Sequence, residues 1–496
     1  MKTKAQVIIL VLCFFYIQNK AQVYFNNRYD GSGSCDGTNS VDTFQNKYLS
    51  FTDECNSISF YNLSVRLFNQ DGTTYKKKTY NWLGSNLLSN TGKYIHIGNH
   101  FYTCGLWVYS GYKSKAFLWR FNSNLDSVKF MAYGFSNQAN NISHFIKHSD
   151  NKIYMVGYVD DTLQTNADIL LIKVDTAGNE IWKKKIGVTG IDENAVSIDT
   201  LQGNLIIAGL RIIHNTSSTD AFVMRLDTAG NIVWQKNINT NSGYSGSKAM
   251  RLKDGNILIC NRLKMYDVGS FTYNRFLIQK ITPNNTLLWQ KTYNTPSVEA
   301  DFLVAIENTE GNIVIAGQKG YTDISVKGTV NVINQNGDSL FYKEFYNEQG
   351  SQNYFRDVIQ APDKGYCFAG FISPVFANGG TGTEDIWLLK VDSNFCESAI
   401  PCNNNVGLSE VEALEATVRV YPNPSNGSFV IEIANEDWLT KPLALTLTDC
   451  LGNNVYSATV THPTSTIQTE NLANGIYFFT LQTKDKKVTK KIIIQK

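Results

Sequence analysis

A chain of 496 residues is longer than one ordinary domain and predicts two or three units, each large enough to bury a core. Hydrophobic residues make up 43% of the chain and charged residues 18%, which excludes general disorder, and the abundance of Tyr and Phe favours β-structure. The formal net charge of +2 comes without a basic stripe, so nucleic acid is not an expected partner.

The first 21 residues have the features of a secretory signal peptide. Lys2 and Lys4 precede an apolar run from Val7 to Ile17, which is too short to span a bilayer and is followed by polar residues. We expect cleavage after Ala21. No later run approaches the roughly 18 apolar residues of a membrane-spanning helix, so the mature chain is expected to have no transmembrane segment.

Export places the cysteines where disulfides can persist. Once Cys13 is removed with the signal, Cys35 and Cys55 form one pair that can close a loop, and Cys396 and Cys402 form another. Three further cysteines lie in apolar strand patterns, where a free thiol acts as a small hydrophobe: Cys104, Cys260 and Cys367. No CxxC motif or Cys/His cluster indicates zinc, and no cofactor is expected.

Two sequence phrases alternate along most of the chain at intervals of about 52 to 58 residues. The first phrase is strand, turn, strand, as in ILLIKVDTAGNEIWKK. In its turn, Asp175 or Asp227 can accept a hydrogen bond from the backbone two residues on, and Gly178 or Gly230 can adopt a positive φ, so the phrase predicts a tight hairpin. Seven copies begin at Leu63, Phe117, Ile169, Ala221, Phe276, Val330 and Asp385.

The second phrase is a turn followed by a buried strand, as in GNLIIAG from Gly203. A less regular segment precedes each copy, for example AVSIDTL from Ala195, so every period contains four short strands. Such units bury both faces when they pack face to face around a ring, which predicts a β-propeller. Large rings that can seal the contact between blades recur in the last strand: Trp182, Trp234 and Trp289.

Seven copies of the first phrase predict seven blades, or six if the weakest copy lies outside the ring. We expect an abbreviated first blade at Tyr48 to Tyr80 and a last blade that stops at its third strand. Val23 to Tyr29 is then predicted to supply the missing outer strand, beside Ile386 to Val391, and the propeller to occupy residues 22–396. The repeat resembles the propeller repeats of secreted Bacteroidetes proteins and is similar in cadence to quinone-type propellers, although the adjacent cysteines of those enzymes are lacking.

The end of the chain is a separate module. After a polar linker at residues 397–417, residues 418–496 alternate as a small antiparallel β-sandwich. This module resembles the sorting domain of the type IX secretion system of Bacteroidetes, whose three motifs fall on Pro422, Pro424, Gly427, Gly475, Tyr477, Lys491 and Lys496. The resemblance implies recognition by an outer-membrane translocon, removal by a sortase, and release from the cell or attachment to its surface.

Catalytic and metal motifs are weak by comparison. His96 and His100, with His144 and His148, have a spacing of four, but in strands such pairs lie about 13 Å apart, and His96 and His148 are expected to be turn residues. No nucleophile elbow, phosphate loop or metalloprotease helix is present in the sequence.

Acidic residues leave two alternatives to a binding function open. Glu193 and Asp301 precede inner strands at matching places, and paired acids in a propeller mouth can hydrolyse glycosides, although solvated loop ends are the simpler interpretation. Asp161 and Asp199 begin short motifs similar to O-glycosylation sites. We therefore predict an exported binding or adhesion propeller for a glycan or protein ligand, with an extracellular enzyme or a structural envelope protein as alternatives.

Overall fold

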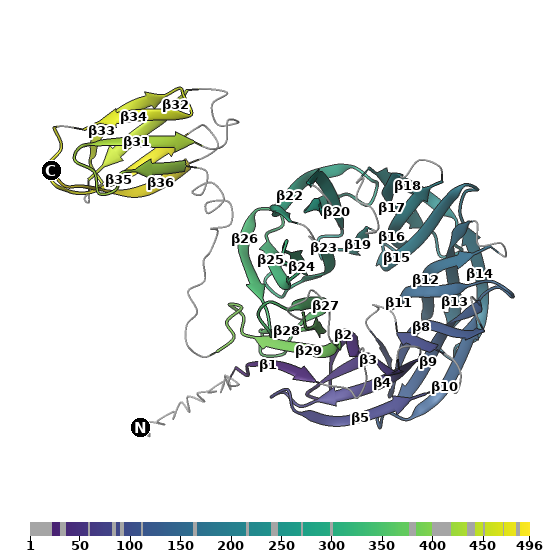
Figure 1. Ribbon diagram of the computed structural model, residues 1–496. Coiled ribbons are helices and arrows are strands. Elements are labelled where there is room, and N and C mark those ends of the chain that lie inside the picture. Colours follow the sequence, from purple (N-terminus) through teal and green to yellow (C-terminus); the bar gives the residue numbers. More distant parts are fainter. Residues whose placement is uncertain are drawn as a thin grey trace, which may run out of the picture.

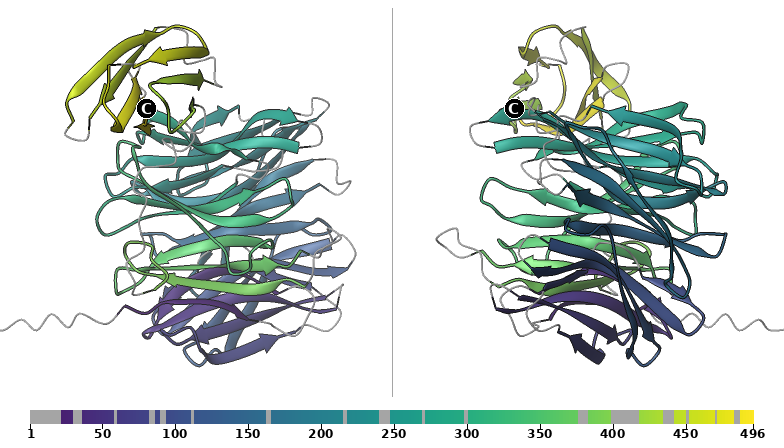
Figure 2. Two further views of the ribbon diagram at one scale, coloured as in Figure 1. Left: turned by 60° about the vertical axis from the view of Figure 1, so that its left-hand side comes forward. Right: turned by 90° about the vertical axis from the view of Figure 1, so that its right-hand side faces the viewer.

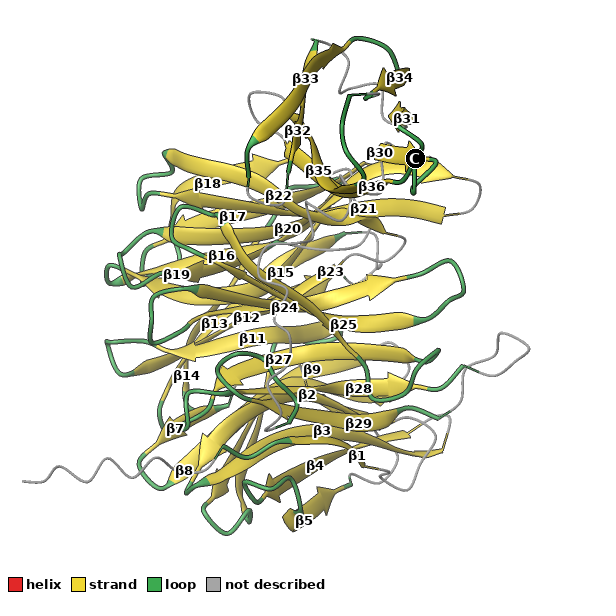
Figure 3. Ribbon diagram, turned by 90° about the vertical axis from the view of Figure 1, so that its left-hand side faces the viewer, coloured by secondary structure: helices red, strands yellow, loops and turns green. Residues whose placement is uncertain are grey.

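The computed structural model describes residues 22–29, 36–57, 60–81, 86–89, 94–110, 113–161, 166–214, 218–239, 247–268, 271–297, 301–375, 383–398, 418–433, 442–449, 452–469, 471–482 and 487–496. Throughout these ranges the regular structure is β-strand and no helix is found (Figure 3), which confirms the all-β prediction. It follows that no helix of this part of the chain is long and apolar enough to cross a membrane. The predicted signal peptide, and the predicted linker from residue 399 on, lie outside the described residues.

Seven four-stranded antiparallel blades surround a central axis (Figure 1). Within a blade the strands follow one another from the axis outward, and the side views in Figure 2 show the twist of each sheet. In blade 2 the innermost strand is divided into two pieces, both paired with β8. The first three blades consist of β2 (Asp36–Phe44), β3 (Lys47–Ser57), β4 (Phe60–Phe68) and β5 (Thr74–Tyr80); β6 (Asn86–Ser89), β7 (Ile95–Ile97), β8 (His100–Ser110), β9 (Lys113–Asn122) and β10 (Ser127–Tyr133); and β11 (Asn140–Lys147), β12 (Lys152–Asp160), β13 (Ala167–Asp175) and β14 (Glu180–Ile186).

Blades 4 to 7 repeat the same order, and a single parallel pairing of Val326 with Gln352 joins blades 6 and 7 into one sheet. They consist of β15 (Ile191–Leu201), β16 (Asn204–Ile213), β17 (Ser218–Leu226) and β18 (Ile232–Ile238); β19 (Lys248–Arg251), β20 (Ile257–Val268), β21 (Phe271–Ile281) and β22 (Leu287–Ser297); β23 (Asp301–Glu307), β24 (Ile313–Gly320), β25 (Val326–Ile333) and β26 (Ser339–Phe345); and β27 (Gln352–Gln360), β28 (Tyr366–Ser373), β29 (Asp385–Val391) and β1 (Phe25–Tyr29).

The N-terminal strand closes the ring, as the sequence predicts. β1 pairs antiparallel with β29, with Phe25 opposite Lys390 and Tyr29 opposite Ile386. Phe25 is buried between blades 7 and 1 with Val41 and other apolar residues. Five separate sheets and one sheet of two blades therefore make a ring of seven, rather than six.

The prediction of an abbreviated first blade is wrong. β2 supplies a complete inner strand, with the sequence DGTNSVDTF. Because many of its side chains are polar, this strand shows no clear apolar pattern in the sequence. Thr38 and Ser40 are nevertheless buried, and the Thr38 hydroxyl donates a hydrogen bond to Phe51 O at 3.2 Å. Hydrogen bonding of buried polar side chains, together with the burial of Val41 and Phe44, therefore places this strand beside the axis.

The hydrophobic core of the propeller is a set of seven layers, one between each pair of neighbouring blades. Between blades 3 and 4, for example, Val156 and Leu171 pack against Ile207 and Phe222. The other layers are built alike, mainly from the second and third strands of adjoining blades. Cys104, Cys260 and Cys367 are free and buried in these layers, as predicted, and burial raises the pKa of each thiol.

The hairpin turns of the first phrase also connect neighbouring blades. Asp175 Oδ1 accepts hydrogen bonds from Ala177 N at 2.9 Å and Asn179 N at 2.8 Å, and Gly178 has a φ of 85°, which confirms the predicted turn. The recurring indoles reach the turn of the next blade: Trp234 Nε1 donates to Pro283 O at 2.9 Å. Trp289 Nε1 donates to Gln335 O at 3.0 Å, and Trp182 packs against Gly230.

The C-terminal domain is a two-sheet sandwich. Residues of both sheets, among them Phe429 and Phe479, share one buried core. The first sheet contains β30 (Val418–Tyr421), β31 (Ser428–Ile433) and β34 (Thr464–Gln468), and the second contains β33 (Asn454–Val460), β32 (Leu443–Thr448), β35 (Gly475–Gln482) and β36 (Lys487–Ile494).

Candidate functional site

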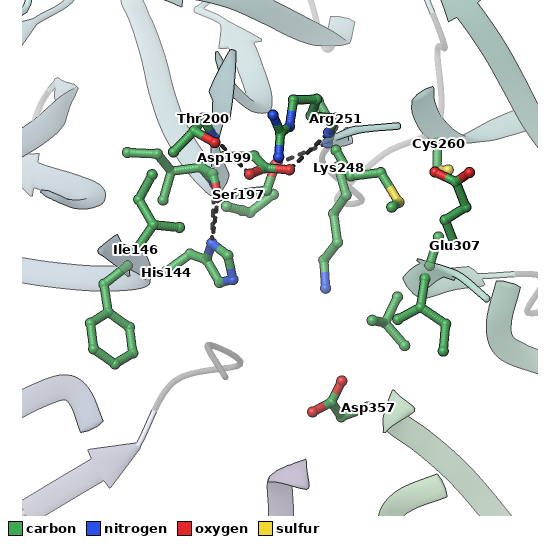
Figure 4. Close-up of a pocket in the computed structure, with 18 of the residues that line it drawn as sticks. His144, Ile146, Ser197, Asp199, Thr200, Lys248, Arg251, Cys260, Glu307 and Asp357 are labelled. Carbon is green, nitrogen blue, oxygen red and sulfur yellow. Dashed lines mark hydrogen bonds between the residues drawn. The ribbon is translucent and has the colours of Figure 1, made fainter. Parts of the chain in front are cut away.

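A cavity of about 580 Å³ lies at the centre of the ring (Figure 4). The innermost strands of blades 3 to 7 (β11, β15, β19, β23 and β27) form most of its wall, and Tyr94 and Ile95 of blade 2 and Lys253 and Cys260 of blade 5 also line it. This volume falls within the usual range for small-molecule sites. The repeat therefore brings one short segment from each of several blades to a single cavity.

One register position recurs around this wall, and we call it the ring position. Most of the innermost strands carry a β-bulge, and the ring position is the residue just after the bulge, or its equivalent in β19. In blades 3 to 7 it is occupied by His144, Ser197, Lys248, Val304 and Asp357.

Three ring-position side chains hold the next blade by its backbone. Ser197 Oγ accepts a hydrogen bond from Ala249 N at 3.0 Å, and Asp357 Oδ2 accepts one from Val41 N at 3.0 Å across the closure of the ring. His144 Nδ1 lies 3.2 Å from Ile198 N and 3.1 Å from Ile198 O, so it bonds this strand in either tautomer. Polar residues at the centre of the propeller thus serve first to join the blades.

The cavity carboxylates are occupied in the same way. Asp199 accepts from Thr200 N at 2.6 Å and from Arg251 N at 2.8 Å, one donor on each oxygen. Glu307 accepts from Lys253 N at 2.6 Å and from Gln335 Nε2 at 3.2 Å.

Asp357 follows the same rule, because its Oδ1 accepts from Val358 N at 2.9 Å while Oδ2 bonds Val41 N. Each carboxylate oxygen of Asp199, Glu307 and Asp357 therefore receives a donor from the protein itself. Burial raises the pKa of the Asp199 carboxyl, against the opposing effect of these N–H groups and of the Arg251 charge.

Among the described residues of the wall, cations outnumber acids. Lys253 Nζ donates to Asn308 O, and the Arg356 guanidinium lies 5.0 Å from the centre of the Phe371 ring. In Figure 4 the Lys248 side chain extends into the open centre of the cavity. The cationic lining residues are Lys147, Lys248, Arg251, Lys253 and Arg356.

The acids singled out from the sequence lie elsewhere. Glu193 is buried and its Oε1 accepts from Arg211 Nε at 3.0 Å in an ion pair within blade 4, so it is neither a solvated loop end nor part of the cavity wall. Asp301 begins β23, and its side chain lies outside the described residues. Asp199 and Asp357 are found by aligning the inner strands of the blades in register. The spacing of acidic residues in the sequence does not indicate them.

The four histidines are separated by the fold. His148 begins a turn, in which Asn151 N donates to His148 O at 3.0 Å, as predicted. His96 lies in strand β7 and packs against Phe44, so its assignment to a turn is wrong, because the pairing of β7 with β8 extends past it. His100 begins β8, and His144 lines the cavity. In the described part of the chain no group of three or more His, Cys, Asp or Glu residues is placed to hold a metal ion.

One of the two predicted loop-closing cysteine pairs can be followed in part. Cys396 is disulfide-bonded. Cys35 and Cys402 lie outside the described residues, as does the side chain of Cys55, so neither predicted pairing is tested.

The motif residues of the C-terminal domain converge on its last strand. Between Pro422 and Pro424, the Asn423 side chain donates to Lys491 O at 2.9 Å and accepts from Ile493 N at 2.8 Å. Gly427 has a φ of 103°, and its carbonyl accepts from Thr469 N at 2.6 Å.

The second and third motifs meet in the same way. Gly475 and Tyr477 of β35 pair with Ile494 and Ile492 of β36. Lys496 Nζ donates to Leu472 O at 2.8 Å, just before Gly475. The first motif and the chain end are therefore joined through β36.

Comparison with known sequences identifies this domain. Residues 419–495 match the family described as the secretion system C-terminal sorting domain. The protein is thus an exported Bacteroidetes protein, delivered by the type IX secretion system to the cell surface or the medium, and its larger domain is a seven-bladed β-propeller. No curated protein matches the chain.

Several solved structures are similar to the propeller. Polysaccharide lyase Uly1 shares 10% identity with a TM-score of 0.45, over 77% of this chain and 94% of that chain. The β-propeller domain of the Trilobed protease from Pyrococcus furiosus shares 10% identity with a TM-score of 0.39, over 76% and 98%. The α-L-arabinanase of Penicillium chrysogenum shares 10% identity with a TM-score of 0.40, over 60% and 92%. These likenesses concern the fold alone and say nothing of a substrate.

Proposed function

We propose that this exported propeller is an extracellular binding protein and that its ligand occupies the central cavity. The observation that carries the proposal is that both oxygens of Asp199, Glu307 and Asp357 accept hydrogen bonds from the protein's own N–H groups. Glycoside hydrolysis needs one protonated and one ionised carboxyl group facing the scissile bond. Acids that hold the blades together are poorly suited to that proton transfer, so binding is favoured over hydrolysis.

Two further features support a ligand at this place. The cavity has the volume of a small-molecule site, and its wall combines apolar side chains with a few polar and charged ones. The wall is also assembled on strands rather than loops, so its side chains are held in place by the sheet.

The experiment is a binding screen of the chain from residue 22 onward against a panel of saccharides and peptides, with a variant that fills the cavity. Val304→Trp suits this purpose, because valine at the ring position has no polar atom and its replacement removes no bond between blades. We expect Val304→Trp to abolish binding of the panel member that the natural chain retains.

The matched control is Val128→Trp, because Val128 is 39% exposed on the outer strand β10. If Val304→Trp lowers the melting temperature, the smaller substitution Val304→Phe is tested in its place. Unaltered binding by a folded cavity-filled variant would place the ligand elsewhere, and shortening of the bound saccharide during incubation would favour the enzyme.

We also propose that the sorting domain meets the translocon and the sortase through its motif residues. The support is their convergence on β36, which presents the first motif and the chain end together. Deleting residues 418–496 in the native host should trap the chain in the periplasm while the propeller keeps its melting temperature. Normal abundance of the truncated chain outside the outer membrane would contradict this proposal.

A further inference from the structure

We infer that the translocon contacts the sorting domain through an apolar surface formed by Ile476, Phe478 and Ile493, which we call the β35–β36 face. The inference rests on the proposed function of the sorting domain, and it adds the surface and the kind of partner: a translocon protein that presents apolar side chains of its own. It is carried by the alternation of side chains along β35, by the pairing of β35 with β36, and by the contacts of the motif residues.

The motif tyrosine fixes which side chains of β35 point outward. Tyr477 is buried in the core of the domain, and its hydroxyl donates to Ala473 O at 2.9 Å. Because side chains alternate along a strand, the neighbours of Tyr477 point away from the core. Ile476 is 48% exposed and Phe478 is 39% exposed. The glycine-tyrosine motif therefore holds in place a strand whose adjacent apolar side chains face outward.

These two side chains belong to one continuous surface. Ile476 lies opposite Ile493 of β36, and Phe478 lies opposite Lys491, where the two strands run side by side (Figure 1). Side chains directly opposite each other in antiparallel strands share one side of the sheet and have Cβ atoms about 4.5–5.5 Å apart. The half-buried Ile493 and the motif residue Lys491 therefore lie beside the exposed apolar side chains.

The fold of the domain does not account for an apolar surface at this place. The buried core of the described domain, and the half-buried residues packed against it, do not include Ile476, Phe478 or Ile493. Elsewhere the same side of the sheet carries hydroxyl groups, as at Thr446 and Thr480, which lie opposite each other on β32 and β35. Adjacent exposed apolar side chains are typical of protein-binding surfaces, and a partner gains affinity by burying its own apolar side chains against them.

The first motif links this surface to sorting. Asn423, between Pro422 and Pro424, donates to Lys491 O and accepts from Ile493 N, so it bonds the backbone of β36 at two residues of the surface. The motif thus fixes the strand that presents Ile493 beside Ile476. Residues 419–495 match the sorting domains of a secretion system, so a surface that the sorting motifs hold in place is suited to the partner that reads them, the translocon.

The test is the location of the full chain in its native host, measured by separating the periplasm, the outer membrane and the medium. The double variant Ile476→Thr/Phe478→Ser should bind the translocon at least about tenfold more weakly and accumulate in the periplasm. Phe478→Leu, which keeps an apolar side chain, should be exported normally. Ile181→Thr removes an isoleucine that is 47% exposed on the propeller strand β14, and this matched control should also be exported normally.

Hydrogen exchange of the purified chain from residue 22 onward shows whether β35 and β36 stay paired in the double variant. If they do not, Thr448→Arg tests the same surface. Thr448 lies opposite Phe478 on β32, so the larger side chain obstructs the β35–β36 face without removing an apolar residue. This variant should also be retained in the periplasm.

Normal export of the folded double variant or of Thr448→Arg, or equal retention of Ile181→Thr, would overturn the inference. Deletion of residues 418–496 separates this failure from that of the proposed function. If the deletion is retained and the double variant is exported, the translocon reads another surface of the domain, whereas normal export of the deletion refutes the proposed function itself. If the natural chain is a dimer and the double variant is an exported monomer, the β35–β36 face joins two copies of the chain and the inference is wrong.

Discussion

Blades 4 and 7 have the same four-stranded architecture but are assembled from the chain in different ways. Blade 4 uses one continuous segment, from Ile191 to Ile238. Blade 7 takes three strands from Gln352–Val391 and its outer strand β1 from the other end of the propeller sequence. Pairing between segments far apart in the chain costs a larger entropy of loop closure. The closure of the ring therefore depends in part on the contacts of one five-residue strand, β1.

Several of the contacts of β1 are polar, and their partners come from blade 7 and from the segment after blade 6. Arg28 pairs with Asp385 of blade 7 and with Glu348, which follows blade 6, the latter at 3.0 Å. Asn26 accepts from Trp387 Nε1 at 2.7 Å and from Asn347 Nδ2 at 2.9 Å. A strand that lacks the covalent continuity of blade 4 is thus held by side-chain hydrogen bonds as well as by the sheet.

Removing the closing strand should give the largest effect. Deleting Val23–Tyr29 exposes the edge of β29 and takes away buried Phe25, which together should destabilise the propeller by at least about 3 kcal/mol. We expect a lower and less cooperative thermal transition. Hydrogen exchange should rise at Ile386–Val391 far more than around Ile206 in blade 4.

An exposed strand edge also invites association between molecules, so the deletion should aggregate at concentrations where the natural chain does not. Equal protection of Ile386–Val391 and Ile206 in the deleted chain, with an unchanged melting temperature, would show that β1 does not stabilise the closure.

The ring-position bonds allow a smaller and better matched test. Asp357→Ala removes the acceptor of Val41 N between blades 7 and 1, and a charged acceptor of a buried N–H is worth about 2–3 kcal/mol. Ser197→Ala removes the neutral acceptor of Ala249 N between blades 4 and 5, for which about 1 kcal/mol is expected. Denaturant unfolding measures both, and a larger loss for Ser197→Ala would contradict the ranking.

Low pH should lower the stability of a blade built from one continuous segment, blade 6, through protonation of Glu344. Burial alone would raise the pKa of Glu344 in blade 6, but hydrogen bonds from Lys319 and Tyr321 outweigh it and lower the pKa to about 2. Because the folded pKa lies below the unfolded value, Glu344 stabilises the fold fully above about pH 4.5 and loses this contribution as the pH falls toward 2.

Glu344→Gln should therefore lower stability at pH 7 by on the order of 1–2 kcal/mol, discounted for the partial exposure of the group, and flatten the decline of the melting temperature between pH 4.5 and 2. Lys183→Gln, at an exposed ion pair of blade 3, serves as the control. Parallel melting curves for Glu344→Gln and the natural chain over this pH range would refute the assignment.

The sequence predicts the hairpins, the closing strand and a ring of seven or six blades, because turn residues and apolar strands repeat with the blade. It does not predict β2, since Thr38 and Ser40 are buried although they are polar, and they leave no apolar pattern. Nor does it predict the cavity, whose residues become comparable only when the bulged inner strands are aligned in register. The position of Glu193 was also not predictable from the sequence. Its ion-pair partner Arg211 lies on the neighbouring strand of a hairpin, and no spacing rule indicates that pair.

The smallest expected effect comes from removing one tyrosine hydroxyl at the ring closure and one between continuous blades. Tyr29 of β1 donates to Gly72 O in the hairpin turn of blade 1, and Tyr133 donates to Gly178 O in the turn of blade 3 at 2.6 Å, so the closing strand repeats a contact used between contiguous blades. Tyr29→Phe and Tyr133→Phe each delete one neutral hydrogen bond and should lower the free energy of global unfolding by about 1 kcal/mol or less.

Local opening should differ between the two variants, because β10 is joined to β9 by its own hairpin while β1 can detach. Amide hydrogen exchange at Ile386–Val391 should rise in Tyr29→Phe, whereas the exchange protection of β9 should stay unchanged in Tyr133→Phe. Equal local effects at the two contacts would mean that the N-terminal strand is held as firmly as a strand within a continuous blade.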